Sequence, residues 1–292
     1  MNSRKVYIVL WLFVFFMTCG TMCALAQDES VEKPIRPVAS VFNFDYGHAS
    51  HLDTYLSPVR YGGNEFRLSY EGQWASGFSP YKWNNQLDLG VEYDNTHNPA
   101  GNHKTHVLMV DARWGMMRRW RDVFTSGLQL KAGGSTQLRG GVLYNDNNSN
   151  NVVSVKAHWS VGFMGQAIYS LPTKRVPITV RYQATLPVAG VFFSPDYDEA
   201  YYEIYLGNHS KLAHFGWWGN RFDMENLLTF DFHLGSTILR VGYRNRIESS
   251  WINNINSQRI SHGIVVGIGG EFMGVNSKKR NNPKNNICSV YQ

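Results

Sequence analysis

Beyond its first 26 residues, this chain of 292 residues lacks any long uninterrupted apolar run, and its mean hydropathy is below zero. A membrane-spanning helix needs about 20 predominantly apolar residues, so the sequence argues against a helical membrane protein. Cysteine is also scarce. Of Cys19, Cys23 and Cys288, only the last would remain after removal of an N-terminal export signal. An intramolecular disulfide is then excluded, and the fold must be held by burial and backbone pairing.

A strong excess of one charge is absent as well. The chain has 28 lysines and arginines against 22 aspartates and glutamates, a net charge of +6, and loss of Arg4 and Lys5 with the export signal would leave about +4. This excess is too small to indicate a nucleic-acid partner. Part of it lies in residues 275–292, a basic stretch that we expect to form a flexible periplasmic tail.

The N-terminus has the pattern of a secretory signal peptide. Arg4 and Lys5 precede an apolar run at residues 6–17, and Ala24-Leu25-Ala26 forms a small-x-small cleavage site. The alternative is a transmembrane anchor, but the run is shorter than a spanning helix requires. We therefore expect residues 1–26 to be removed during export, and residues 27–274 to form one domain.

The sequence does contain many segments in which apolar and polar side chains alternate, such as residues 107–114 and 238–246. A period of two is typical of a strand with one apolar and one polar face. The 9 tryptophans and 16 tyrosines suit the aromatic girdles of a membrane protein. Most segments reach the length of about 9–11 residues that crosses a bilayer. A soluble β-sandwich or lipocalin-like barrel would also alternate, with its apolar face inward.

The segments predict an all-β fold, a transmembrane antiparallel up-and-down β-barrel. We expect about ten strands, at residues 38–47, 64–75, 83–94, 104–117, 122–134, 152–169, 176–188, 222–234, 237–250 and 258–273. Short connections alternate with long ones at 48–63, 95–103, 135–151, 189–221 and 251–257. Outer-membrane barrels have this arrangement, with short periplasmic turns and longer outside loops. Twelve strands is the alternative, because residues 201–206 could add a strand within the longest connection.

Several motifs resemble an uncharacterised family of Gram-negative outer-membrane β-barrel proteins, a domain of unknown function. They are Asp53-Thr54-Tyr55-Leu56-Ser57-Pro58 with Tyr61-Gly62-Gly63, Ser194-Pro195-Asp196-Tyr197 with residues 201–208, and the closing stretch from 220 to 272. The resemblance covers most of the chain after the signal peptide. It implies a barrel in the outer membrane of a Gram-negative bacterium, and it implies no activity or catalytic residues.

Charged residues that alternate with apolar positions should face the lumen of the barrel. They include Arg67, Glu71, Asp88, Glu92, Asp111, Lys156, Arg181, Arg240 and Arg244. These charges could neutralise one another and fill a narrow barrel, because unpaired charges away from water are costly. They could instead line a small channel that selects among solutes. We favour the filled lumen, since side chains fill the interiors of the smallest barrels.

Two long connections, 48–63 and 189–221, are the expected recognition surface, with binding residues Asp53, Tyr55, Tyr197, Tyr201, Tyr202, Trp217 and Trp218. A histidine paired with a carboxylate can activate water or a hydroxyl, so the catalytic candidates are His48, His51, Asp53, Asp196, His209 and Ser210. No spaced signature supports them. We therefore expect surface binding, envelope integrity or narrow-solute passage, with a lipase- or protease-like outer-membrane hydrolase as the alternative.

No metal or cofactor is expected, because His48 and His51 alone are weak grounds for a metal site. The expected partners are outer-membrane lipid and the machinery that inserts barrels into the outer membrane. No nucleic acid is expected, and the sequence does not indicate a particular ligand.

Overall fold

The computed structural model describes residues 36–146, 152–171, 173, 176–197, 199–207, 212–272 and 288–291. These residues belong to one compact unit, Pro34–Gln292. The expected signal peptide, residues 1–26, and the most basic part of the expected tail, residues 278–284, lie outside the described residues. No helix in the described ranges is long and apolar enough to cross a membrane.

Strands account for nearly all of the described secondary structure. Their bounds are β1 Val38–Asp53, β2 Ser57–Ala75, β3 Trp83–His97, β4 Lys104–Arg121, β5 Leu128–Asn145, β6 Val153–Leu171, β7 Ile178–Phe193, β8 Ala213–Trp217, β9 Arg221–Leu234, β10 Thr237–Ile252 and β11 Ile255–Phe272. The one helix described is short, α2 at Tyr201–Tyr205. Each of the ten long strands overlaps a predicted one, because their alternating patterns are long and regular.

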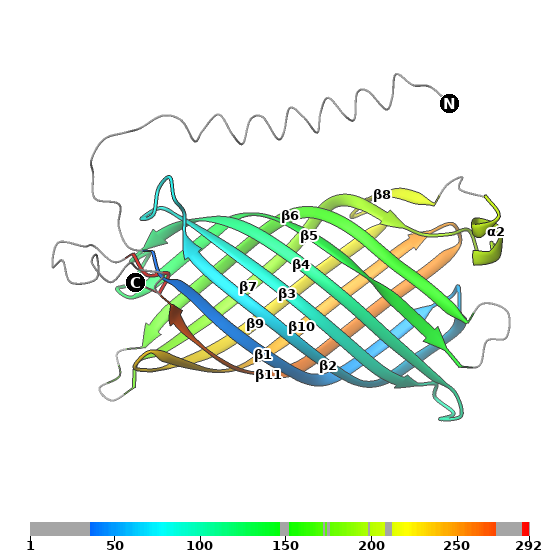
Figure 1. Ribbon diagram of the computed structural model, residues 1–292, viewed down its shortest axis with the longest axis horizontal. Helices are drawn as coiled ribbons and strands as arrows, with labels where there is room; N and C mark the ends of the chain where they lie inside the picture. The colour runs from blue at the N-terminus through cyan, green and yellow to red at the C-terminus, as the bar shows by residue number, and fades with distance from the viewer. Residues whose placement is uncertain are drawn as a thin grey trace, which may run out of the picture. The chain divides into compact units, whose positions relative to one another are not determined.

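The strands form a closed antiparallel barrel (Figure 1). Consecutive strands pair as neighbours, and the sheet closes where β1 pairs with β11, from Val38 opposite Phe272 to Asp53 opposite Ser257. Ten strands make up the wall, because β8 pairs only with the stretch of β7 that lies beyond β9. The prediction of a ten-stranded barrel is confirmed.

The barrel has two distinct ends (Figure 1). At the first, which we call the terminal end, β1 begins and β11 ends, and residues 76–82, 122–127 and 235–236 connect strands. At the other, the loop end, the connections are residues 54–56, 98–103, 146–152, 194–212 and 253–254. The helix α2 and strand β8 belong to the loop end, within the longest connection.

The strands extend further towards the loop end than the sequence pattern predicts. β1 continues to Asp53 and β2 begins at Ser57, so the prediction of a long loop at 48–63 is wrong. β2 has 19 residues, about twice the length needed to cross a bilayer. Beyond the membrane, both faces of a strand meet water and can be polar. The apolar alternation therefore ends before the backbone pairing does.

The longest connection also differs from its predicted form. Tyr201–Tyr205 is helical, so the twelve-strand alternative, which made residues 201–206 a strand, is wrong. Glu203 Oε2 accepts a hydrogen bond from the Ala200 amide at 3.2 Å, which is one of the two bonds of a capping box and favours the helix over an extended chain. The strand in this connection is instead β8, Ala213–Trp217, which the alternation pattern did not indicate because it has five residues.

The outer face of the barrel is apolar and its inner face is polar. Large apolar side chains such as Leu68 and Ile264 are 64% and 62% exposed, while Glu92, Arg139 and Arg181 are almost completely buried. A soluble sandwich or lipocalin-like barrel would place these two classes the other way round. An apolar surface that encircles the barrel needs a bilayer around it, so this is the architecture of a membrane barrel.

Candidate functional site

A continuous network of ion pairs fills the middle of the barrel. None of its side chains is more than 15% exposed. The arginines in it are Arg67, Arg113, Arg139, Arg244, Arg246 and Arg259, and the carboxylates are Asp45, Glu65, Asp88, Glu92, Asp94, Asp111, Glu225 and Glu248. Each charge has an opposite partner, which is the condition under which buried charges are tolerated.

Several ion pairs join strands that are far apart in the sheet. Arg181 on β7 donates to Glu71 on β2 at 2.6 and 2.8 Å, and these two strands stand on opposite sides of the wall. Arg246 on β10 reaches Glu92 on β3 at 2.5 Å. Because these side chains cross the lumen instead of following its wall, they occupy the space that a channel would need.

Gly90 on β3 makes another of these contacts possible. Arg67 on β2 donates two hydrogen bonds, of 2.6 and 2.9 Å, to Asp111 on β4, and β3 lies between these strands. A Cβ at Gly90 would lie 2.0 Å from Nη2 of Arg67. Any larger residue at this position would therefore push the guanidinium away from Asp111.

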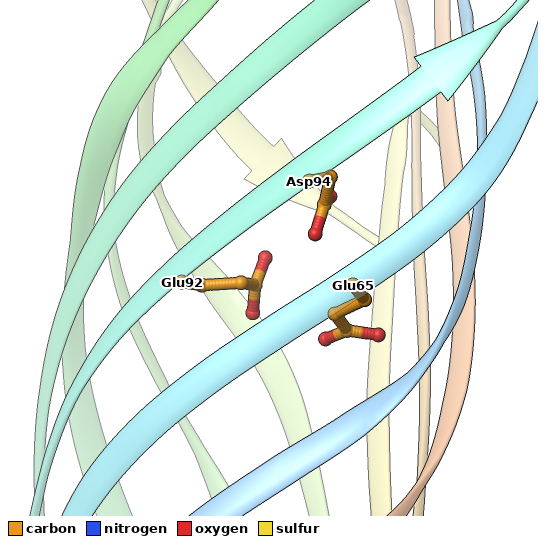
Figure 2. Close-up of side chains that lie close together, drawn as sticks. All are labelled: Glu65, Glu92 and Asp94. Carbon is orange, nitrogen blue, oxygen red and sulfur yellow. The ribbon is translucent and has the colours of Figure 1, made fainter.

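Three carboxylates of the network lie close enough together to suggest a cation site. Glu65 on β2 and Glu92 and Asp94 on β3 point towards one another, with one oxygen of each within 4.8 Å of the others (Figure 2). The guanidinium of Arg259 already satisfies them. It lies 3.1 Å from Glu65, 2.6 Å from Glu92 and 3.1 Å from Asp94. The cluster is therefore neutralised by the chain itself.

The terminal end contains a second cluster and the last described residues of the chain. Arg240 binds Asp231 at 2.7 Å and Glu71 at 3.2 Å. Beside this cluster, Lys131 donates to the carbonyl of Val290 at 3.2 Å. Cys288, Ser289 and Val290 are buried, so the described part of the expected flexible tail, residues 288–291, is packed against the barrel.

The loop end contains a cavity of about 60 Å³, which we call the recess. One side of it is apolar, formed by the buried cluster Val107, Met109 and Leu143 with Phe192. The side chains that line its other side are polar or charged: His51, Lys156, His158, Arg221, Glu248 and Arg259. An apolar surface with a few polar groups is the kind of lining found in small-molecule sites, although the recess is smaller than the roughly 300–1,000 Å³ of pockets that enclose a whole ligand.

Lys156 and Arg221 carry the most accessible charges of the recess. Nζ of Lys156 lies 2.8 Å from Asp53, and Nε of Arg221 lies 2.7 Å from Asp223. The side chains of Lys156 and Arg221 are 24% and 17% exposed, against 4% for Asp53 and 11% for Asp223. The cations are thus more accessible than the carboxylates that pair with them, and the recess presents positive charge to an entering ligand.

Residues 194–197 and 199–207, which include α2, form a cap over the loop end. Tyr55, in the turn between β1 and β2, donates through its hydroxyl to the carbonyl of Glu199 at 2.9 Å, and its ring makes an edge contact with Tyr201. These contacts join the turn between β1 and β2 to the cap. Burial and the nearby Tyr201 raise the pKa of Tyr55 above its usual value, which keeps its hydroxyl protonated as a donor.

Two further bonds hold the cap in place. The amide of Val155 at the start of β6 donates to the hydroxyl of Tyr201 at 2.6 Å. Asn253, in the turn between β10 and β11, donates to the carbonyl of Pro195 at 3.2 Å. The cap is thus bonded to two turns of the loop end and to strand β6, and it has a defined position.

The candidate catalytic residues do not converge. His48 is exposed on the outer side of β1, where its ring lies near that of His262. His51 is buried in the interior, but its partner is Asp94, at 2.7 Å, and not Asp53. Arg259 binds the same oxygen of Asp94 at 3.1 Å. Asp196 belongs to the cap, whereas His209 and Ser210 lie outside the described residues.

The expected binding residues divide into two groups. Asp53 pairs with Lys156 of the recess, and Tyr55 contacts Tyr201, which belongs to the cap. The side chains that point outward, from 51% to 69% exposed, are Tyr197, Tyr202, Trp217 and Trp218. The apolar side of the recess could not be predicted from the sequence. Val107, Met109 and Leu143 have the spacing of ordinary strand residues, and only their position above the charged interior distinguishes them.

The apolar exterior, the charged interior and the closed ten-stranded wall together define an outer-membrane type of β-barrel. The chain belongs to the family described as "Protein of unknown function (DUF3316)", whose model matches residues 7–279. No curated protein matches the chain.

Two solved structures with a similar fold are distant in sequence. The translocator domain of the autotransporter NalP from Neisseria meningitidis is 8% identical, with 92% of this chain and 98% of that chain covered and a TM-score of 0.34. An outer membrane channel from Pseudomonas putida F1 is 7% identical, with 85% and 100% covered and a TM-score of 0.32. The family assignment rests on the family model alone.

Proposed function

We propose that this protein is a barrel of the Gram-negative outer membrane that binds a small molecule in the recess, on the cell-surface side, and conducts no solute through its lumen. The observation that carries the proposal is the ion-pair network between the recess and the terminal end. Opening a pore through it would require several buried pairs to break, at about 3–5 kcal/mol for each charge left unpaired. Narrow-solute passage is therefore the less favoured of the expected roles.

The recess supports the binding part of the proposal. Its apolar side can take up the body of a ligand, while Lys156 and Arg221 can orient a charged or polar group. Ser194, at the start of the cap, lines the recess, and the bond from Tyr55 to Glu199 fastens the cap to the barrel. A ligand held there would be shielded from water on several sides, as ligands in binding sites are.

A hydrolytic role has less support. Activation of water or a serine needs a histidine whose second nitrogen faces a nucleophile. Among the described residues, the histidine with a carboxylate partner is His51, and it shares Asp94 with Arg259. The positive guanidinium reduces the ability of Asp94 to orient His51 and to stabilise its protonated form. We therefore favour binding over catalysis.

Cysteine labelling on intact cells tests the proposed location and orientation. In a Cys288→Ser background, Asn102→Cys places a thiol in an exposed turn at the loop end, and Ser236→Cys is its matched control at the terminal end. We expect a membrane-impermeant maleimide to label the Asn102→Cys protein on intact cells, and the Ser236→Cys protein only after the outer membrane is permeabilised. The reverse pattern would place the recess in the periplasm and contradict the proposal.

A further inference from the structure

Among the described strands, the largest interruption of the barrel wall lies between β7 and the strands that follow the cap. β7 pairs with β9 from Ile178 to Thr185 and with β8 from Ala189 to Phe193. Thr185 and Ala189 are four residues apart on β7, whereas their partners, Glu225 on β9 and Trp217 on β8, are eight residues apart. The ladder between β7 and the β8–β9 side is therefore broken at residues 186–188, and the register shifts in the other described ladders, at His51/Asp53 and at Val161/Gly162, are smaller.

The chemistry of this break makes it easier to open than the rest of the wall. Pro187 has no amide hydrogen to donate to a neighbouring strand. Its carbonyl accepts a hydrogen bond from the indole nitrogen of Trp218 at 2.8 Å, and Trp218 is 51% exposed. A single side-chain bond therefore holds the wall where several backbone bonds would otherwise lie.

A crevice lies at the break and reaches towards the recess. Its lining includes Trp159 and Trp217, which are exposed on the outer face, and also the inward-facing His158 and Arg221. His158 and Arg221 line the recess as well. Gly216 leaves space at this junction, because a Cβ there would lie 3.1 Å from the ring of Phe192. The crevice and the recess thus have a common boundary.

We propose that the break is a lateral entrance, through which a single-chain amphipathic anion passes between the membrane and the recess. This inference rests on the proposed function of the recess. The apolar side, with Met109 and Phe192, contacts the part of the chain next to the head, and Lys156 and Arg221, the most accessible cations of the recess, bind the anionic head. A cavity of about 60 Å³ holds only the part of one chain nearest the head, since a cavity of about 150 Å³ binds a ligand the size of benzene; the rest of the chain would lie in the crevice.

A reversible disulfide across the edge of the break tests the entrance. Ala189 and Trp217 are directly opposed in the β7–β8 register, and opposed residues of antiparallel strands are about 4.5–5.5 Å apart, within the range for a disulfide. The variant Ala189→Cys/Trp217→Cys in the Cys288→Ser background would fasten β7 to β8. The matched control, Leu108→Cys/Val142→Cys, joins opposed, outward-facing residues of β4 and β5 away from the break.

The probe is a diazirine-labelled palmitic acid, added to proteoliposomes of phosphatidylcholine and photolysed after set intervals. We expect the unmodified barrel to be labelled in peptides containing Met109 or Phe192. The oxidised Ala189→Cys/Trp217→Cys barrel should be labelled at least about five-fold less at short times, reduction should restore the labelling, and the control disulfide should have no effect. Palmitic acid should also lose labelling in Lys156→Gln, whereas the diazirine analogue of hexadecanol, which has no carboxylate, should not.

The outcomes separate this inference from the proposed function. If the recess of the unmodified barrel is not labelled even at long times, the recess does not bind the probe and both proposals fail. If the recess is labelled equally fast with the disulfide oxidised or reduced, binding in the recess stands and the lateral entrance is wrong. If Lys156→Gln leaves the labelling by palmitic acid unchanged, the anionic head is wrong.

Discussion

Arg246 joins two parts of the charged interior. It donates to Glu92 on one side at 2.5 Å and to Glu225 on the other at 2.7 Å, and it is 4% exposed. Alternation along a strand shows that such a residue faces the interior, because side chains alternate between the two faces. It does not show which carboxylate it meets, since that depends on strands as far away in the sequence as β3 and β10. The role of Gly90 also depends on the three-dimensional structure, because the side chain of Arg67 from the neighbouring strand passes over it.

The variant Arg246→Ala tests the energetic weight of the network. Removing one member of a buried charged set leaves its partners incompletely neutralised, so we expect a loss of about 3 kcal/mol in the free energy of unfolding. The matched control is Arg60→Ala, because Arg60 is exposed and bonded to Gln258; its loss should be about 0–1 kcal/mol. Urea titration in phospholipid vesicles measures both. Equal losses would show that the network adds little stability.

A charge on the outer face tests the membrane facing. Leu89 is 42% exposed and lies in the middle of β3, so Leu89→Arg should cost about 2–4 kcal/mol in the bilayer. Val59 has the same exposure, 42%, but lies near the loop end of β2, so Val59→Arg should cost about 0–1 kcal/mol. The same urea titration applies. A larger cost at Val59 than at Leu89 would contradict the assigned position of the bilayer.

The ten strands of the wall could be predicted from the sequence, whereas the structure of the loop end could not. A strand that contacts lipid on one side and the interior on the other alternates strictly. Above the membrane this constraint is lost, so β1 and β2 continue unnoticed through residues 48–63. The conformation of the described residues between 194 and 220 depends on contacts such as those of Tyr55 with Glu199 and of Trp218 with Pro187. No local sequence pattern predicts these contacts.

Replacing the cap tests whether it is a separate element. The amide of Ser194 donates to the carbonyl of Leu212 at 3.0 Å, so the ends of the segment between them are adjacent. An Asn-Gly turn in place of residues 195–211 should close this hairpin. We expect the variant to insert and to remain heat-modifiable on a denaturing gel, because the wall is intact. Failure to insert would mean that the cap is needed to form the barrel.

The same replacement should uncover the recess. Ser250 lines the recess, so a Ser250→Cys thiol in the Cys288→Ser background reports on its accessibility. An impermeant maleimide should label this thiol several-fold faster without the cap, whereas labelling of Asn102→Cys, in a different turn, should not change. If the Ser250→Cys rate is unchanged, the cap does not shield the recess.

The central feature of the whole molecule is a barrel with an apolar outer face and an interior that is filled by paired charged side chains. The bilayer stabilises the outer face, and the crossing pairs such as Arg181 with Glu71 stabilise the inner one. The sequence supplied the fold class and the facing of the charges. The recess, the cap and the break at Pro187 depend on how distant segments meet, so they became visible only in three dimensions.

Single-channel recording in planar bilayers tests the closed lumen most directly. We expect the purified barrel to show no steady conductance, and the variant with the Asn-Gly turn in place of the cap to show none either, because the ion-pair network and not the cap closes the interior. The double variant Arg181→Ala/Arg246→Ala, which removes two of the crossing side chains, should give measurable conductance. A steady, ohmic conductance from the unmodified protein would contradict the account.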